Sequence, residues 1–238
     1  MRIDPPARAL AHGIAGARDG TLGAGDFVWS TNRAQLDVAI VLEPEVPASI
    51  CAQVHYLSMV ALGDALGARI PPEIAVTYRW PGTLCVNGAR AGAARLAMSP
   101  ERDENGWPRW LVAGVEIALR GDLSDPDPGR NPDITSLDQE GAGDVSRTEL
   151  IESFARHFLS WLHRWEDEGF APVHAVWLGR TEDRGKTLAL AQRGKVVSGA
   201  FLGLDDHGNL LLKSDTGVSC VATLASEAFV ACDEVRDG

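Results

Sequence analysis

The pattern of apolar residues changes near residue 178, and this change restricts the architectures open to the chain. Before residue 178, segments with helical periodicity alternate with short β-rich segments. After it come five short, glycine-containing β segments, at 187–191, 196–203, 209–213, 218–223 and 227–231. Short strands at this spacing are typical of a small antiparallel barrel. We therefore predict two domains, 1–177 and 178–238, the second of them an SH3-like β-barrel.

Three helices are predicted in the first domain. Residues 7–18 form an alanine-rich segment, and residues 48–66 carry apolar side chains at three- and four-residue steps. The third helix begins at Ser146, which with Glu149 matches a capping box, where each side chain satisfies a backbone NH at the helix start. This helix ends at Gly169. Each segment has an apolar side with which it can cover a sheet.

The remaining segments of this domain predict strands. Residues 36–42 are apolar almost without interruption, which suits a strand buried on both faces. Residues 121–144 are rich in proline and acidic residues, so we predict an exposed loop there. A mixed β-sheet with flanking helices follows, and the fold class is α+β. Further strands are expected at 74–80, 84–86, near 96 and at 110–119.

The charge balance argues against nucleic acid as a partner. Twenty-two Lys and Arg residues face 33 Asp and Glu residues, for a net charge of −11, whereas binding a phosphate backbone requires clustered positive charge. The first residues lack the pattern of a signal peptide, and no apolar stretch has the length of a membrane helix. We expect a cytoplasmic protein with no membrane partner.

No metal site is predicted. The four cysteines, Cys51, Cys85, Cys220 and Cys232, form no Cys-x-x-Cys pair, and the six histidines lack ligand spacing with one another or with a cysteine. Reduced thiols are therefore expected. The tripeptide from Asp215 to Gly217 matches that of aspartic proteases, but it lies between two predicted hairpin strands, where Asp and Gly are ordinary turn residues.

Residues 79–94 are the most informative stretch for function. A strand, a tight turn and a second strand follow one another, and Arg90 is surrounded in sequence by glycine and alanine. Small residues let a backbone approach a ligand closely while one cation reaches it, an arrangement that suits a carboxylate. The alternative is a closely packed Gly/Ala-rich hairpin in which Arg90 is a solvated surface charge.

Three motifs resemble the biotin and lipoate protein ligase family. They are Arg79-Trp80-Pro81-Gly82-Thr83, Gly88-Ala-Arg90-Ala-Gly92 and Gly114-Val-Glu116-Ile-Ala118. Residues 199–212 also resemble the small barrel appended to biotin ligases. The resemblance implies a class II synthetase-like core, with biotin or lipoate and Mg-ATP as ligands and a biotin or lipoyl carrier protein as partner. It implies a catalytic role for Arg90 and ligand-binding roles for Arg79, Trp80, Pro81, Gly88, Gly92, Gly114, Trp29, Gly23 and Gly25.

The same motifs depart from the family pattern at positions that carry chemistry. The family lysine that contacts the ligand carboxylate is Arg90 here, and the Asn-Asp of the turn is Gly82-Thr83. The asparagine of the third motif is Ala118. The family's Gly-Arg-rich loop is expected between Thr21 and Trp29, an interval that holds no arginine. An adenylating enzyme needs cations to hold ATP and to stabilise departing pyrophosphate.

Three functions remain open from the sequence. The first is a divergent relative that binds a small carboxylate or a carrier domain and whose ligase chemistry is degenerate. The second is an active ATP-dependent biotin or lipoate protein ligase that forms an acyl-adenylate. The third is an octanoyl-type acyltransferase that works through a thioester on Cys85, the cysteine nearest the candidate pocket.

Overall fold

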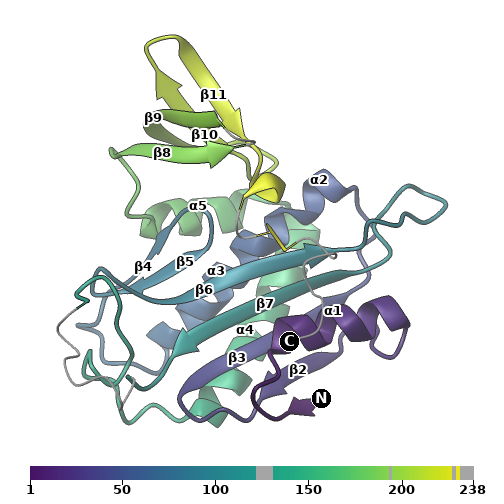
Figure 1. Ribbon diagram of the computed structural model, residues 1–238, viewed down its shortest axis with the longest axis vertical. Coiled ribbons are helices and arrows are strands. Elements are labelled where there is room, and N and C mark those ends of the chain that lie inside the picture. The colour runs from purple at the N-terminus through teal and green to yellow at the C-terminus, as the bar shows by residue number, and fades with distance from the viewer. Residues whose placement is uncertain (122–130, 193–194, 227–228, 231–238) are drawn as a thin grey trace.

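A computed structural model describes residues 1–121, 131–192, 195–226 and 229–230 (Figure 1). Its centre is an eight-stranded sheet in the order β1-β2-β3-β7-β6-β5-β4, with β12 pairing β6 outside this path. Neighbouring strands are antiparallel, except that β1 runs parallel to β2 and β12 parallel to β6. The strands are β1 Arg2–Ile3, β2 Phe27–Ser30, β3 Gln35–Leu42, β4 Val76–Arg79, β5 Thr83–Val86, β6 Ala89–Met98, β7 Leu111–Ala118 and β12 Phe229–Val230.

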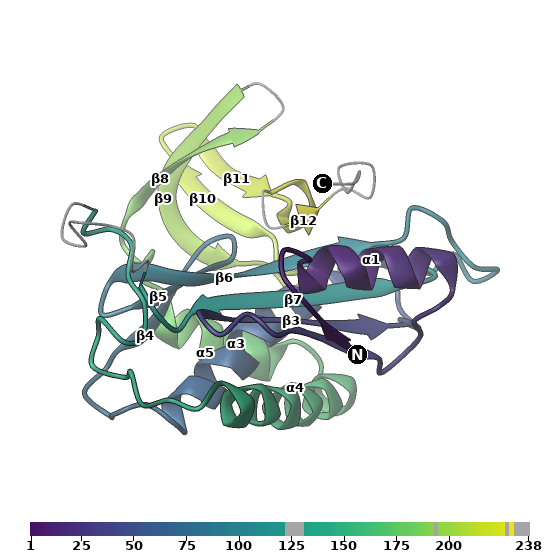
Figure 2. The same cartoon turned by 60° about the horizontal axis from the view of Figure 1, so that its bottom comes forward.

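Helices cover the two faces of this sheet unequally. Helix α1 (Ala9–Asp19) lies alone over one face, across β3 and β7 (Figure 2). The other face is covered by α3 (Gln53–Gly67), with α4 (Arg147–Glu168) and α5 (Ala171–Arg180) packed against it. A short α2 (Ala48–Cys51) precedes α3. The face under α1 is called the α1 face below, and the face under α3 the helix-layer face.

The register of β3 shows why its sequence is apolar throughout. Leu36, Val38 and Ile40 belong to the core under α3, while Ala39 and Val41 belong to a second cluster under α1. A strand with helices on both faces buries both sets of alternating side chains. The prediction of a strand buried on both faces is therefore confirmed.

The predicted helices are present, with two corrections. The segment 48–66 is divided at Ala52 into α2 and α3. At the start of α4 the Ser146 hydroxyl accepts a hydrogen bond from the NH of Glu149, as predicted. The Glu149 carboxylate does not complete the capping box in the described structure: it accepts a hydrogen bond of 2.9 Å from Arg69 and none from the NH of Ser146.

The C-terminal residues form a separate antiparallel sheet. Its strands pair in the order β11-β10-β9-β8. The fifth predicted segment does not join them, because Phe229 and Val230 pair with Leu96 and Ala97 of β6 in the large sheet. Among the described residues no pairing closes this sheet into a barrel. The strands are β8 Thr187–Gln192, β9 Lys195–Leu204, β10 Leu210–Ser214 and β11 Gly217–Val221.

Buried hydrogen bonds join the small sheet to the core. The Tyr56 hydroxyl of α3 donates to the carbonyl of Gly208 at 2.7 Å and lies 2.8 Å from the Thr223 hydroxyl. The side chain of Gln53 donates to the carbonyl of Asp206 at 2.7 Å. The domain boundary at residue 178 stays a prediction; α5 ends at Arg180 and β8 begins at Thr187. None of the helices in the described part of the chain combines the length and apolarity needed to cross a membrane.

Candidate functional site

Arg90 lies on β6 beside a small concavity of about 100 Å³. Its backbone is fixed, since its NH donates to the Asp133 carbonyl at 2.8 Å and its carbonyl accepts from the NH of Thr135 at 2.9 Å. Its side chain is exposed and forms no ion pair with any residue that the structure describes. The concavity is lined by Pro81, Gly82, Thr83, Arg90, Ala93, Ala94 and Arg95.

A buried histidine holds the turn beneath this concavity. The Nε2 of His55 lies 2.7 Å from the carbonyl oxygen of Pro81, to which it donates in the matching tautomer. Burial lowers the pKa of His55 from 6.5 to about 4, against the Pro81 carbonyl, which raises it. A Cβ at Gly82 would lie 2.7 Å from the His55 ring and 2.5 Å from the Ala94 carbonyl oxygen, so this turn requires glycine. The Gly82 that departs from the family pattern is therefore explained by packing.

Arg79 and Trp80, both predicted to bind ligand, are held by the protein itself. Arg79 donates from Nε to the Glu182 carboxylate at 2.8 Å and from a second nitrogen to the Gly88 carbonyl. The NH of Trp80 donates to Asp183 at 2.6 Å, and its indole donates to the Tyr56 hydroxyl at 3.1 Å. Neither residue lines the concavity at Arg90.

The three glycines of the second and third motifs have structural roles, Gly88 through its backbone conformation and Gly92 and Gly114 through close packing. Gly88 and Asn87 have φ values of 87° and 49° and make the tight turn between β5 and β6. A Cβ at Gly92 would lie 2.2 Å from the Glu116 carbonyl oxygen of β7. At Gly114 a Cβ would lie 3.1 Å from the side chain of Leu10 in α1.

Three further predicted residues lie away from Arg90. Gly23 and Gly25 are in the turn between α1 and β2, where Gly25 lines a different cavity of about 700 Å³. Trp29 packs against the core of the helix-layer face, and the guanidinium carbon of Arg147 lies 5.5 Å from its ring centroid. Of the predicted residues, the concavity brings together Pro81 and Arg90.

An ion-pair cluster occupies the neighbouring part of the α1 face. Asp37 and Glu116 are directly opposite each other on β3 and β7, and Arg8 donates a hydrogen bond to Glu116. Asp37 is 4% exposed, accepts from the NH of Ala9 at 3.2 Å and lies 3.9 Å from Arg8. Burial raises the pKa of Asp37, against the lowering by the Ala9 NH and by Arg8. The Arg8 charge is therefore already compensated.

Sequence reasoning assigns no role to Arg8 or Asp37. A signal for Asp37 exists, because a carboxylate within the apolar run 36–42 needs a partner once the strand is buried on both faces. No local pattern identifies Arg8 as that partner.

Cys85 has the environment of a core residue. It is fully buried, and burial raises its pKa to about 11 even though the charge of Arg79 acts to lower it. A cysteine nucleophile needs a lowered pKa and access to substrate. The geometry does not support an acyl-enzyme at this position.

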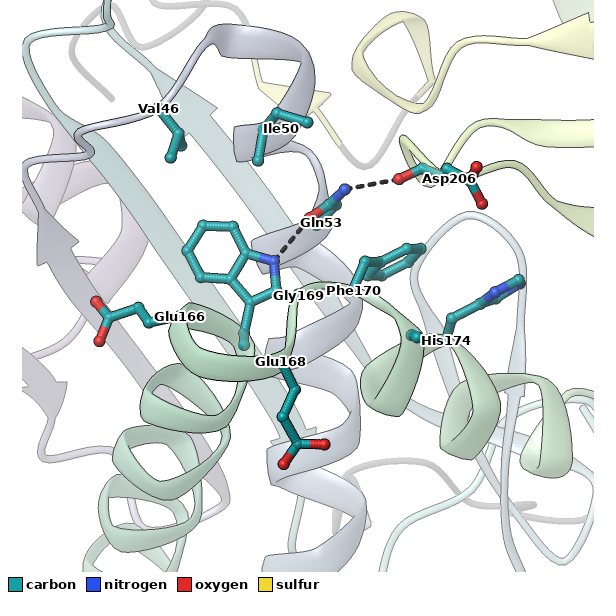
Figure 3. A pocket seen from close by; sticks show the side chains of 11 residues that line it. Val46, Ile50, Gln53, Glu166, Glu168, Gly169, Phe170, His174 and Asp206 are labelled. Carbon is teal, nitrogen blue, oxygen red and sulfur yellow. Dashed lines mark hydrogen bonds between the residues drawn. The ribbon is translucent and has the colours of Figure 1, made fainter.

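Two larger cavities, of about 590 and 700 Å³, lie near the C-terminal end of α4, away from Arg90; both are lined by Val46, Trp165 and Glu166. One of about 590 Å³ is lined by Val46, Ile50 and Phe170, among others, with Glu166 and Glu168 at its edge (Figure 3). In it the Trp165 indole donates to Gln53 at 2.6 Å. Among the described residues that line this cavity there is no Lys or Arg for a carboxylate or phosphate, and burial lowers the pKa of the lining His174. Within the described ranges, no group of three or more His, Cys, Asp or Glu residues could hold a metal ion.

Comparisons with known proteins agree with the fold and the motifs. A sequence profile described as Biotin/lipoate A/B protein ligase family matches residues 1–179, and one described as Biotin protein ligase C terminal domain matches residues 185–227. A biotin–[acetyl-CoA-carboxylase] ligase of Paracoccus denitrificans is 30% identical over 231 residues, which are 92% of this chain and 93% of that protein.

Solved structures show the same architecture. A biotin protein ligase-like protein of unknown function from Silicibacter sp. TM1040 has a TM-score of 0.80 and 34% identity and covers 94% of both chains. The biotin protein ligase of Aquifex aeolicus has a TM-score of 0.73 at 14% identity, with 95% of this chain and 96% of that chain covered, and shares the fold. From the match over residues 1–179 and the relative at 30% identity, this chain belongs to the biotin/lipoate A/B protein ligase family.

Proposed function

We propose that this protein binds a carboxylate-bearing ligand, a small acid or a group on a carrier domain, through Arg90 and does not activate it as an acyl-adenylate. The observation that carries the proposal is the exposed Arg90 side chain, which has no ion-pair partner among the described residues and lines a concavity. A guanidinium fork matches the two oxygens of a carboxylate.

The size of the concavity supports binding without adenylation. Pockets that enclose a whole small-molecule ligand have volumes of roughly 300–1,000 Å³, whereas this one has about 100 Å³. It suits one carboxylate with the rest of the ligand outside. Arg8, a further cation of the α1 face, is bound to Glu116, and the carboxylates of Glu116 and Asp37 oppose the binding of a triphosphate.

The second candidate is an active ligase that transfers biotin or lipoate to a carrier protein. The observation in its favour is the relative from Paracoccus denitrificans, which is described as a biotin–[acetyl-CoA-carboxylase] ligase and is 30% identical to this chain. In that case Arg90 would neutralise the acid carboxylate or the adenylate phosphate.

We also propose a cytoplasmic location. The three described cysteines are free thiols, in keeping with this location.

One set of samples separates the two candidates. The purified protein is melted with biotin, lipoate and octanoate, each with and without Mg-ATP, and the same samples are assayed for pyrophosphate. We expect acid alone to raise the melting temperature, because a ligand that binds the native state stabilises it, and we expect no pyrophosphate. Release of pyrophosphate that depends on both acid and ATP would establish the ligase and refute our proposal.

The role of Arg90 is tested by Arg90→Gln, with Arg156→Gln as control. Arg156 is an exposed arginine on α4. We expect Arg90→Gln to abolish stabilisation by acid and Arg156→Gln to preserve it. If no acid stabilises the wild-type protein, or if Arg90→Gln responds as wild type does, the concavity is not the binding site.

A further inference from the structure

We propose that Arg33, Arg120 and Arg147 form a second ligand site, which binds the phosphate group of a small molecule. They line a cavity of about 360 Å³ together with Leu119 and Thr148, among others. The proposal goes beyond the function proposed above, because it concerns another part of the molecule and another chemical group.

The second site is separate from the concavity at Arg90. The two cavities share no lining residue. Leu119 and Leu137, which line the second site, belong to the core of the helix-layer face. Ala93, which lines the concavity at Arg90, is instead the strand partner of Glu116 on β7. The Glu116 side chain accepts a hydrogen bond from Arg8 on the α1 face.

Three segments far apart in the sequence bring the cations together. Arg33 is in the turn between β2 and β3, Arg120 follows the end of β7, and Arg147 is the first residue of α4. Arg147 is held in place, since it donates a hydrogen bond to the Ser30 carbonyl and lies over the ring of Trp29. Arg147 is therefore held in position, and Arg33 and Arg120 line the same cavity from two other segments.

The positive charge of this cavity is not balanced by the described residues. Burial lowers the pKa of Arg147, and the charges of Arg33 and Arg2 lower it further. None of the three lining arginines forms an ion pair with a described residue, although arginines elsewhere in the chain do. Like charges held together without a counter-charge are costly, and a bound anion would remove that cost.

Three acidic residues adjoin the lining residues in the sequence, and none forms an ion pair with the three arginines in the described structure; they are Asp138, Asp144 and Glu149. Asp138 accepts from the NH of Gly121 at 3.0 Å and from the NH of Gln139 at 2.9 Å, both through Oδ1, which also accepts from the Ser136 hydroxyl. The Asp138 carboxylate therefore stabilises the turn that follows β7. In the described structure it forms no ion pair with Arg33, Arg120 or Arg147.

The chemistry of the site favours phosphate over a carboxylate. A phosphate group carries up to two negative charges at neutral pH and several acceptor oxygens, which suits three arginines that line one cavity from three segments of the chain. The Thr148 hydroxyl lines the same cavity. The first turn of the 22-residue helix α4 adds its partial positive charge. The volume accommodates inorganic phosphate, pyrophosphate or the phosphate end of a nucleotide.

The experiment measures phosphate binding by the whole protein. Melting temperature and isothermal titration are recorded with inorganic phosphate, pyrophosphate and AMP, against sodium chloride at the same ionic strength. We expect specific stabilisation by phosphate, and tighter binding of pyrophosphate or AMP would identify a phosphorylated small molecule as the source rather than the free ion. Equal effects of phosphate and chloride would overturn the proposal.

Variants locate the binding. Arg33 and Arg120 are exposed, so Arg33→Gln/Arg120→Gln is expected to fold, and we expect it to weaken phosphate binding at least about tenfold. The matched control Arg18→Gln/Arg156→Gln removes two exposed arginines elsewhere and should bind as wild type does. Wild-type affinity in the first double variant would refute the site. Arg90→Gln should keep phosphate binding even if it loses carboxylate binding, which separates this proposal from the first.

Discussion

Two groups of arginines at the large sheet, Arg8 on one face and Arg33, Arg120 and Arg147 on the other, differ in their counter-charges. On the α1 face, Arg8 lies against two carboxylates, and the buried Asp37 also accepts a backbone NH. On the helix-layer face, Arg33, Arg120 and Arg147 surround a cavity, and no described residue forms an ion pair with them. A cation that the fold neutralises contributes to stability, whereas a cation left without a counter-charge is available to a ligand.

This difference also explains why a family resemblance alone does not locate function. The motif residues Arg79 and Trp80 are held by Glu182, Asp183 and Tyr56, and they connect the turn before β5 to the C-terminal part of the chain. Their residue types match the family, but their side chains are engaged within the protein. Arg90 has no such ion-pair partner among the described residues.

The largest expected effect tests the close packing of β6 and β7, on which both faces depend. Gly92→Ala would place a Cβ 2.2 Å from the Glu116 carbonyl oxygen, which is backbone and cannot rotate away. We expect a loss of about 3 kcal/mol in the free energy of unfolding, measured by urea denaturation. The control is Gly179→Ala in α5, where no atom lies within 4 Å of the added Cβ, and a gain of about 0.5 kcal/mol is expected. Equal stability of the two variants would contradict this packing.

An intermediate effect tests the buried histidine under the Arg90 concavity. The folded-state pKa of His55 is about 4, below the 6.5 of the unfolded chain, so the unfolded state binds the extra proton between these values. Stability contributed by neutral His55 is therefore lost as the pH falls from 6.5 toward 4, by about 2 kcal/mol at pH 5. Free energies of unfolding from pH 7 to pH 4.5 should fall less steeply in His55→Gln.

The control for this measurement is His207→Gln, which changes an exposed histidine of the small sheet. It should keep the pH dependence of the wild-type protein. If His55→Gln and His207→Gln show the same slope, His55 does not titrate as its burial indicates.

The smallest effect compares Arg8 with Arg33 directly. Because the Arg8 side chain is 52% exposed, its coupling to Glu116 should be modest, about 0.5–1 kcal/mol in a double-mutant cycle of Arg8→Gln and Glu116→Gln. Arg33→Gln on the other face removes a cation that repels Arg147, so we expect no loss of stability and a gain of up to about 0.5 kcal/mol at low salt. A loss on removing Arg33 equal to that on removing Arg8 would contradict the difference in counter-charge between these two arginines.

Local patterns in the sequence were sufficient for much of the fold. The periodicity and caps of α1 and α4, the apolar run of β3 and the glycine-rich hairpin of β5 and β6 each depend on interactions within a few residues. The order of these elements, with three motifs at family-like spacing, led to the correct family. The family resemblance also identified the departures at Gly82, Arg90 and Ala118.

Tertiary structure alone decided which charges meet. Arg8 reaches Glu116 across 108 positions of sequence, and Arg147 reaches the Ser30 carbonyl across 117. It also placed Phe229–Val230 on β6 rather than in the small sheet, and Trp29 away from Arg90. Strand pairing and the face to which a side chain points depend on long-range register, and one residue of slip exchanges the faces. The sequence therefore determined the elements and the family, while the packed sheet determined which arginines are neutralised and which remain open to a ligand.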